Sequence, residues 1–147
     1  IVATDRAPHP AEAKECEWQE AAFGMLGLES ALSIINQTMV QTGLLTWEGV
    51  ADRMSRAPAR IAGYETHGGK IEVGATAHLT VINPTQTYRV DRDLVASRSR
   101  NTPFHGMELS GVVQATFFRG IPTYLAGQLT SIHSNGSNSQ MQGGSSR

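Results

Sequence analysis

A short apolar run that stops at an acidic residue is the feature that most constrains the fold of this chain. The run Ile1-Val2-Ala3 is rich in β-branched residues, and Thr4-Asp5 follow it directly. A short strand that is apolar throughout belongs in a parallel sheet, where neighbouring strands flank it on both sides. Asp5 then lies at the carboxyl end of the strand, which faces the ligand crevice in parallel α/β folds. The first half of the chain offers few other strands, so we expect an α/β fold and a piece of a larger protein.

Pro8 turns the backbone out of the predicted strand, which brings His9 back over the same mouth. A carboxylate and an imidazole four positions apart on such a turn can hold a proton, a metal ion or an anionic substrate. A second interpretation stays open, in which Asp5 caps a following helix and His9 is an ordinary loop residue. Spacing alone favours this second interpretation.

Composition narrows the class of protein. Of the 147 residues, 39% are hydrophobic and 17% are charged, and the formal net charge is −1, so the balance gives no electrostatic footprint for nucleic acid or an acidic membrane. The sequence contains no apolar stretch of about 18 residues and no signal-peptide pattern. Cys16 is the only cysteine, which excludes internal disulfides and a cysteine-based zinc site. We expect a soluble, cytoplasmic protein with no nucleic-acid or membrane partner.

Helical signals follow the opening turn. Residues 11–20 are rich in Glu and Ala and predict a loose helical stretch. Residues 28–41 predict a firm helix that ends at Gly43, because apolar residues recur on one face. That core-facing stripe consists of Leu28, Ala31, Leu32, Ile35 and Met39. Thr46 is expected to cap a second helix over residues 47–55, and a short third helix is predicted over 59–62, after Pro58.

The periodicity changes to that of strands after Gly63. Five segments separated by Gly, Asn and Pro turns predict a small β-module, namely residues 70–73, 79–82, 88–90, 112–118 and 122–124. A sheet this small is marginal alone, so we expect partner strands elsewhere. Residues 129–147 are mostly Ser, Asn, Gln and Gly, and this composition predicts a disordered tail.

Self-sufficient catalytic sets are missing from the sequence. The five histidines do not form a His-x-His or His-Glu-x-x-His pair, and no Gly-rich phosphate loop or Gly-x-Ser-x-Gly elbow occurs. A working metal site normally needs three or more protein ligands. Asp5 is the only good candidate ligand, so this chain is not expected to build a metal site alone.

Six strings of residues resemble, in order, the signatures of one enzyme family. They are Ala3-Thr4-Asp5-Arg6-Ala7-Pro8-His9, Phe23-Gly24-Met25-Leu26-Gly27-Leu28-Glu29, Pro58-Ala59-Arg60-Ile61, Val73-Gly74, Ala77-His78-Leu79 and Ser99-Arg100-Asn101-Thr102-Pro103-Phe104-His105-Gly106. The family is the class I dihydroorotases of the amidohydrolase superfamily, metal-dependent enzymes of pyrimidine biosynthesis built on a TIM barrel. The first string is similar to the end of the eighth barrel strand. The resemblance covers residues 1 to about 128.

The resemblance implies a role for four residues. Asp5 would be the catalytic aspartate that contacts the metal centre and shuttles the proton, with one or two Zn²⁺ as cofactor. His9 would bind the substrate carboxylate, and Phe23 and Gly24 would contribute backbone groups to the pyrimidine ring. The reaction implied is the reversible interconversion of dihydroorotate and N-carbamoyl-aspartate, with these small molecules as partners and a homo-oligomer left open.

The resemblance also implies an incomplete architecture. Residues 1–63 would be the terminal part of a (β/α)8 barrel, with the last βα unit and the helices after it. Residues 64–128 would be the carboxyl-terminal part of a small β-sandwich, and 129–147 the polar tail. The family's other metal ligands lie upstream, so the fragment alone is expected to be inactive.

Two departures from the family pattern concern charged or polar positions. Arg6 stands where many members have His or Ser, and strand alternation is expected to turn it away from the mouth. His78 replaces an acidic or Asn residue usual in the β-module, without an expected catalytic role.

Two other function classes stay open. One is another cyclic amidohydrolase of the hydantoinase or dihydropyrimidinase kind, although Ala7-Pro8-His9 favours dihydroorotase over these relatives. The other is a non-catalytic, dihydroorotase-like module that serves in assembly.

Overall fold

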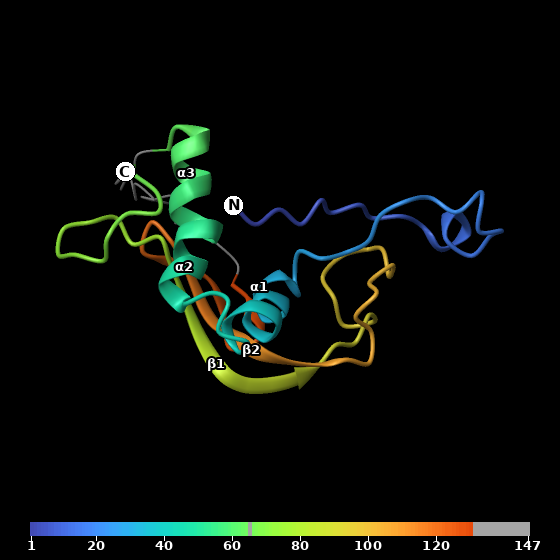
Figure 1. Cartoon of the computed structure of the whole chain (residues 1–147). Helices are drawn as coiled ribbons and strands as arrows, with labels where there is room; N and C mark the ends of the chain where they lie inside the picture. The colour runs from blue at the N-terminus through green and yellow to red at the C-terminus, as the bar shows by residue number, and fades with distance from the viewer. Residues whose placement is uncertain (65, 131–147) are drawn as a thin grey trace, which may run out of the picture.

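The chain folds into two groups of helices and an antiparallel sheet, preceded by a long extended segment. The computed structural model describes residues 1–64 and 66–130. Figure 1 shows the opening segment running far out to one side before it returns to the helices, while the sheet curves beneath them. The described part is therefore helices packed on an antiparallel sheet, and it contains no parallel strand pair.

The opening segment is extended but is not a strand. Residues 1–10 have no regular secondary structure, which corrects the prediction for Ile1-Val2-Ala3. The physical reason is that a strand needs hydrogen-bonding neighbours, and the described sheet lies elsewhere. Isolated backbone hydrogen bonds hold the segment instead. The Val2 N–H donates to the carbonyl of Arg53 at 3.0 Å, and the Ala7 N–H donates to the carbonyl of Met25 at 3.1 Å.

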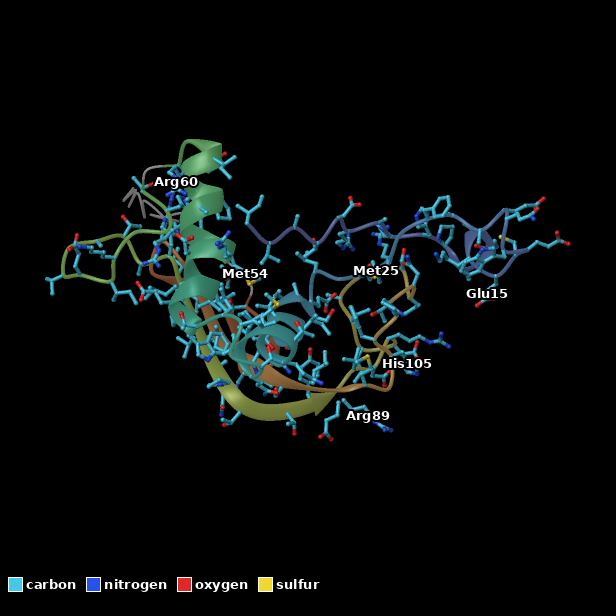
Figure 2. All side chains as sticks on the ribbon, in the orientation of Figure 1. Glu15, Met25, Met54, Arg60, Arg89 and His105 are labelled. Carbon is cyan, nitrogen blue, oxygen red and sulfur yellow. The ribbon has the colours of Figure 1, made fainter. Side chains whose placement is uncertain are left out.

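The excursion beyond Pro10 is mostly irregular. Only the 3₁₀ turn η1 (Ala11–Ala13) forms within the loose helical stretch predicted over 11–20. Most of these side chains are exposed, so nothing packs against them to support a longer helix. Figure 2 shows Glu15 at the far end of this excursion, well away from Met54 and Arg60 on the helices.

The helix predicted over residues 28–41 is confirmed in its central part. It consists of α1 (Ala31–Ile35), which continues into the π-helix η2 (Asn36–Val40). Residues 28–30 form a turn before it. Gly43 has a φ of +78° after the end of the helix, the left-handed conformation expected of a glycine that stops a helix.

The second and third predicted helices form one continuous helix. It runs through α2 (Trp47–Ala51), the π-helix η3 (Asp52–Arg56) and α3 (Ala57–Ala62). Thr46 caps it as predicted, because its side-chain oxygen accepts the Gly49 N–H at 3.2 Å.

The predicted break before residue 59 is wrong because the π-helix accommodates Pro58. In η3 the Ala57 N–H donates to the carbonyl of Asp52, so the next donor in that pattern would be residue 58 bonding to Arg53. Pro58 has no N–H. The carbonyl of Arg53 accepts the Val2 N–H instead, which ties the opening segment to this helix.

Four antiparallel strands pair in the order β1-β2-β3-β4. They are β1 (Leu79–Arg89), β2 (Glu108–Phe118), β3 (Ile121–Leu125) and β4 (Gln128–Leu129). The segments predicted at 79–82 and 88–90 are one strand whose pairing with β2 is irregular between Asn83 and Thr87. The strand predicted at 70–73 is wrong, since those residues have no pairing partner among the described strands.

The predicted polar tail begins later than expected. Leu129, the first residue assigned to it, pairs with Tyr124 as part of β4. The rest of the predicted tail from residue 131 onward lies outside the described residues.

The helix face that packs on the sheet is polar, which corrects the predicted apolar stripe. Leu28 is 62% exposed, whereas Ser30, Ser33 and Asn36 are buried. Asn36 donates to the Pro84 carbonyl at 3.0 Å and to the Ser110 hydroxyl at 3.1 Å. These small polar side chains let the helix approach the sheet closely, and the apolar stripe stays partly exposed in the described chain.

None of the helices in the described ranges has the length and apolar character needed to cross a bilayer.

Candidate functional site

His9, Phe23 and Gly24, to which the resemblance assigns substrate-binding roles, lie close together in the structure. The His9 Nε2 lies 2.6 Å from the Phe23 carbonyl oxygen. Gly24 has a φ of +106°, and a Cβ built on it would lie 2.3 Å from the Ala7 Cβ and 3.7 Å from the His9 Nε2. Only a residue without a side chain fits this close approach, so the opening segment and the Phe23-Gly24 peptide are in direct contact.

The hydrogen-bond partner of the His9 ring shows which ring nitrogen is already engaged. A carbonyl oxygen only accepts hydrogen bonds, so the Nε2 bonded to Phe23 carries the proton. Nδ1 is therefore the ring nitrogen that remains for a ligand. His9 itself is half-buried, whereas the Phe23 side chain is 96% exposed. Phe23 thus contacts the His9 ring through its backbone carbonyl and not through its side chain.

Asp5 lies in the same segment but does not contact His9 by any hydrogen bond or ion pair within residues 1–64 and 66–130. Its side chain is exposed and its φ is +42°. A non-glycine residue in the left-handed region is uncommon, although Asp is enriched there, and such strain gathers at functional sites. The backbone conformation therefore marks Asp5 as a residue held in an unusual orientation.

Arg6 is engaged away from Asp5. Its Nη2 donates to the Ser97 hydroxyl at 2.8 Å, in the β1–β2 loop, which comprises residues 90–107. In the same loop the backbone N–H groups of Ala96 and Ser97 donate to the Glu29 carboxylate at 3.1 and 3.3 Å. The guanidinium is thus part of a contact between the loop and the opening segment.

Two further residues join the cluster that sequence reasoning did not single out. The Lys14 Nζ donates to the carbonyls of Ala22 at 2.7 Å and Gly24 at 3.1 Å. Asn101 bonds to Ala7, His9 and Gly24 through its side chain. The one signal for Asn101 was its place in the string Asn-Thr-Pro-Phe within the family resemblance. Lys14 gave no signal, because it lay in a stretch predicted to be helical.

A metal centre does not form from the described residues alone. Among residues 1–64 and 66–130, no group of three or more His, Cys, Asp or Glu side chains is placed to hold a metal ion. A single carboxylate such as Asp5 does not fix a Zn²⁺, which takes at least three protein ligands. The donor set of this chain therefore does not fit the zinc expected from the resemblance without further ligands.

A second cluster of aromatic and imidazole rings lies apart from these residues. The rings of His67 and His78 stack with centroids 4.0 Å apart, and Phe118 lies 5.0 Å from His78. Partial burial lowers the pKa of His78, and His67 and Arg119 lower it further. This cluster belongs to the sheet and the loop before it, and it shares no residue with the predicted site.

Known proteins resemble this chain in sequence. It is 54% identical over 130 residues to the dihydroorotase of Streptomyces coelicolor, covering 88% of this chain and 30% of that protein. It is 48% identical over 128 residues to the dihydroorotase of Mycobacterium tuberculosis, covering 87% of this chain and 30% of that protein. No family model matches the chain.

Solved structures resemble it in fold. The L-hydantoinase (dihydropyrimidinase) of Arthrobacter aurescens superposes with a TM-score of 0.76 at 31% identity, covering 84% of this chain and 28% of that one. The dihydropyrimidinase of Brevibacillus agri gives a TM-score of 0.76 at 22% identity, covering 85% and 28%, and this second likeness concerns the fold alone.

The chain is thus of the cyclic amidohydrolase class, to which the hydantoinases also belong. Within that class it belongs to the dihydroorotase family, as the resemblance predicted. It spans about 30% of the length of the curated relatives it matches.

Proposed function

We propose that this chain forms part of a dihydroorotase, which interconverts dihydroorotate and N-carbamoyl-aspartate. The observation that carries the proposal is the 2.6 Å contact between the His9 Nε2 and the Phe23 carbonyl. It joins residues 14 positions apart, both of which the resemblance assigns to the substrate. The identity of 54% to a named dihydroorotase over 130 residues supports the same function.

The proposed chemistry is hydrolysis of the ring amide and its reversal. In the hydrolytic direction, the oxygen of a water molecule adds to the ring carbonyl and the C–N bond breaks. Asp5 takes the proton from the water and passes it to the departing ring nitrogen, which suits a carboxylate that can accept a proton transiently. His9 binds the substrate carboxylate, and the backbone of Phe23 and Gly24 contacts the ring.

The proposal includes a cofactor and a surrounding architecture. Zn²⁺, one or two ions, would have Asp5 as one ligand and needs others beyond those described. Residues 1–63 are proposed as the last βα unit and following helices of a TIM barrel, and 64–128 as part of a β-sandwich. A cytoplasmic location and a small-molecule substrate belong to the same proposal, which the single cysteine and the named relatives support.

A chimera tests the role of Asp5. In the chimera this chain replaces the aligned 130 residues of the Streptomyces coelicolor dihydroorotase. Because general acid–base catalysis contributes about 10²- to 10⁴-fold, Asp5→Asn is expected to lower kcat for dihydroorotate by about that factor. The matched control is Asp52→Asn, which removes a partly exposed carboxylate paired with Arg56 on η3. A kcat in Asp5→Asn within about twofold of that of Asp52→Asn contradicts the proposed role.

A second candidate function is hydantoinase-like amide hydrolysis. The observation that favours it is the 31% identity and TM-score of 0.76 to the Arthrobacter aurescens L-hydantoinase. A parallel chimera built on that enzyme separates the two. Hydantoin turnover there, together with no dihydroorotate turnover in the first chimera, selects the second function.

A further inference from the structure

Three segments that are far apart in the sequence meet at one side chain, that of Asn101. Its Nδ2 donates to the Ala7 carbonyl at 2.8 Å and to the Gly24 carbonyl at 3.5 Å. Its Oδ1 accepts the backbone N–H of His9 at 3.3 Å. Its own carbonyl accepts the backbone N–H of Leu26 at 3.1 Å. Asn101 therefore bonds to both sides of the contact between His9 and Phe23.

The chemistry of these partners fixes which side chain fits. A peptide N–H only donates and a peptide carbonyl only accepts, so the site needs one acceptor and one donor group side by side. The carboxamide of asparagine supplies both. A carboxylate would only accept, and it would face the carbonyls of Ala7 and Gly24 without a proton to donate.

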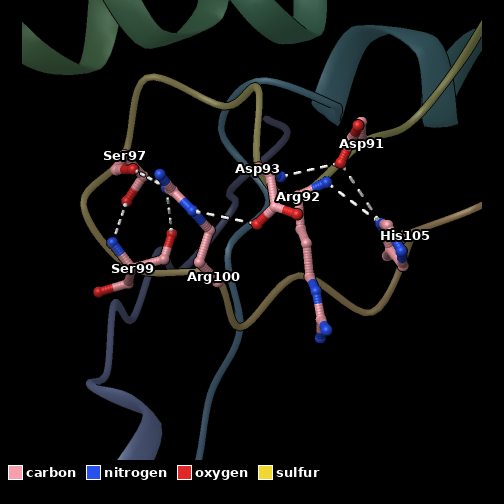
Figure 3. A network of polar contacts seen from close by, with 7 residues as sticks. All are labelled: Asp91, Arg92, Asp93, Ser97, Ser99, Arg100 and His105. Carbon is pink, nitrogen blue, oxygen red and sulfur yellow. Dashed lines mark hydrogen bonds and ion pairs between the residues drawn. The ribbon is translucent and has the colours of Figure 1, made fainter.

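The β1–β2 loop, which carries Asn101, makes polar contacts within itself, and Figure 3 shows them. Next to Asn101, Arg100 pairs with Asp93 at 3.7 Å and donates to the carbonyls of Ser97 and Ser99. His105 lies 3.9 Å from Asp91 at the other end of the loop. The loop is thus tied to itself on both sides of Asn101.

We infer that Asn101 is a positioning residue, which sets His9 against the Phe23-Gly24 peptide and so fixes the orientation of the ring that binds the substrate carboxylate. This inference rests on the proposed function of His9. Asn101 acts through His9 and does not touch the substrate. The β-module thereby contributes a residue to the site, because Asn101 lies in its β1–β2 loop, 92 residues after His9 in the sequence.

A double-mutant cycle in the chimera tests this inference, because coupled residues give non-additive effects. Asn101→Ala is expected to raise the KM for dihydroorotate about tenfold, with a smaller effect on kcat, since misplaced binding groups weaken substrate positioning. In a His9→Ala background the same substitution is expected to change KM less than about threefold. Equal effects in the two backgrounds, or no effect in either, overturn the inference.

Hydrogen–deuterium exchange of the same proteins gives a readout independent of activity. Asn101→Ala is expected to speed exchange in peptides covering residues 7–9 and 22–26 and to leave β1 and β2 unchanged. The control is Asn83→Ala, which removes an acceptor for the N–H groups of Thr85 and Gln86 within β1. It is expected to leave both KM and the exchange of residues 7–9 unchanged.

The two readouts separate this inference from the proposed function. If the chimera is inactive but Asn101→Ala speeds exchange only in residues 7–9 and 22–26, the proposed function is contradicted and the positioning contact is supported. An active chimera in which exchange rises uniformly, or not at all, overturns the positioning role while the function survives.

Discussion

At Gly24 the absence of a side chain allows two segments of the chain to touch. A Cβ added to Gly24 would lie 2.3 Å from the Ala7 Cβ, which is far closer than two carbon atoms that are not bonded can approach. The φ of +106° adds strain for any other residue. Two separate causes therefore require glycine at this position, and they have different consequences on substitution.

Gly24→Ala is expected to destabilise the chimera by more than Gly43→Ala. At Gly43 the φ is +78° and nothing lies within 4 Å, so only the left-handed backbone strain of about 1–2 kcal/mol applies. At Gly24 the clash adds to this strain. Urea denaturation of both variants measures the difference, and equal losses would show that the contact with Ala7 has no energetic weight.

His78 gives the folded chain a dependence on acid. Its pKa is lowered from 6.5 by partial burial and by the nearby His67 and Arg119, so the unfolded chain takes up the proton more readily than the folded one. Stability from this group is full above the unfolded pKa and falls as the pH drops through it. Phe118 is the other ring packed against His78, and it carries no charge.

His78→Asn is expected to reduce the loss of thermal stability between about pH 7.5 and pH 5.5. The neutral side chain cannot take up the proton that favours the unfolded state. Melting temperatures at the two pH values measure the effect, and the measurement at the higher pH is the internal control. A loss as large as that of the parent protein would mean that other groups govern the acid response.

At the scale of elements, local signals predict the structure well, whereas packing does not follow from them. The cap at Thr46 and the stop at Gly43 were predictable because each depends on a few neighbouring residues. The continuous helix through Pro58 was not predictable in this way. It depends on the π-helix before Pro58 and on the hydrogen bond from the Val2 N–H, and a rule that treats each residue separately includes neither.

In the sheet and in the candidate site, too, some features were predictable from the sequence and others were not. Alternation predicted a strand at 70–73 that has no partner among the described strands, and it split β1 in two because Asn and Pro occur within it. The family resemblance assigned His9, Phe23 and Gly24 to the substrate without predicting that they touch, and the structure brings them together. The part played by Asn101 depends on a loop 92 residues away, and long-range contacts of this kind leave no periodic signal.

Asn36 is expected to matter more to stability than its polar character suggests. It is 2% exposed and donates to Pro84 and Ser110, so Asn36→Ala removes two hydrogen bonds, of which the one to Ser110 is buried, at about 1–3 kcal/mol in total. Thr38→Ala on the exposed side of the same helix is the control, expected within about 0.5 kcal/mol. Denaturant unfolding of both variants decides, and similar losses would show that the polar helix–sheet contact adds nothing.

At the scale of the whole molecule, the described chain leaves much apolar surface uncovered. Trp18 and Phe23 are 93% and 96% exposed on the excursion, and Ile71 and Val73 are exposed before the sheet. The chain also spans only about 30% of the length of its curated relatives. We expect catalysis by the proposed site to need residues beyond those described, because no group of three metal ligands lies within residues 1–64 and 66–130.

The isolated chain with added Zn²⁺ is expected to show no dihydroorotate turnover above an Asp5→Ala control. Its described residues offer no group of three metal ligands, so calorimetric titration is expected to find no tight Zn²⁺ binding. Mixing the chain with the separately produced remainder of the Streptomyces coelicolor enzyme is expected to restore turnover. Activity of the chain alone would contradict the division of the site proposed here, and no activity on mixing would favour the non-catalytic assembly module.

Pro58 has an effect that reaches beyond its own helix. By leaving the Arg53 carbonyl free for Val2, it anchors the backbone three residues ahead of Asp5, while the bond from Ala7 to Met25 anchors it two residues behind. The backbone that carries the Asp5 carboxylate is therefore held by a hydrogen bond on each side, at Val2 and at Ala7. A residue with an amide proton at position 58 would add a donor that competes with Val2 for the Arg53 carbonyl, so a substitution more than fifty residues from Asp5 is expected to weaken the upstream anchor of the site.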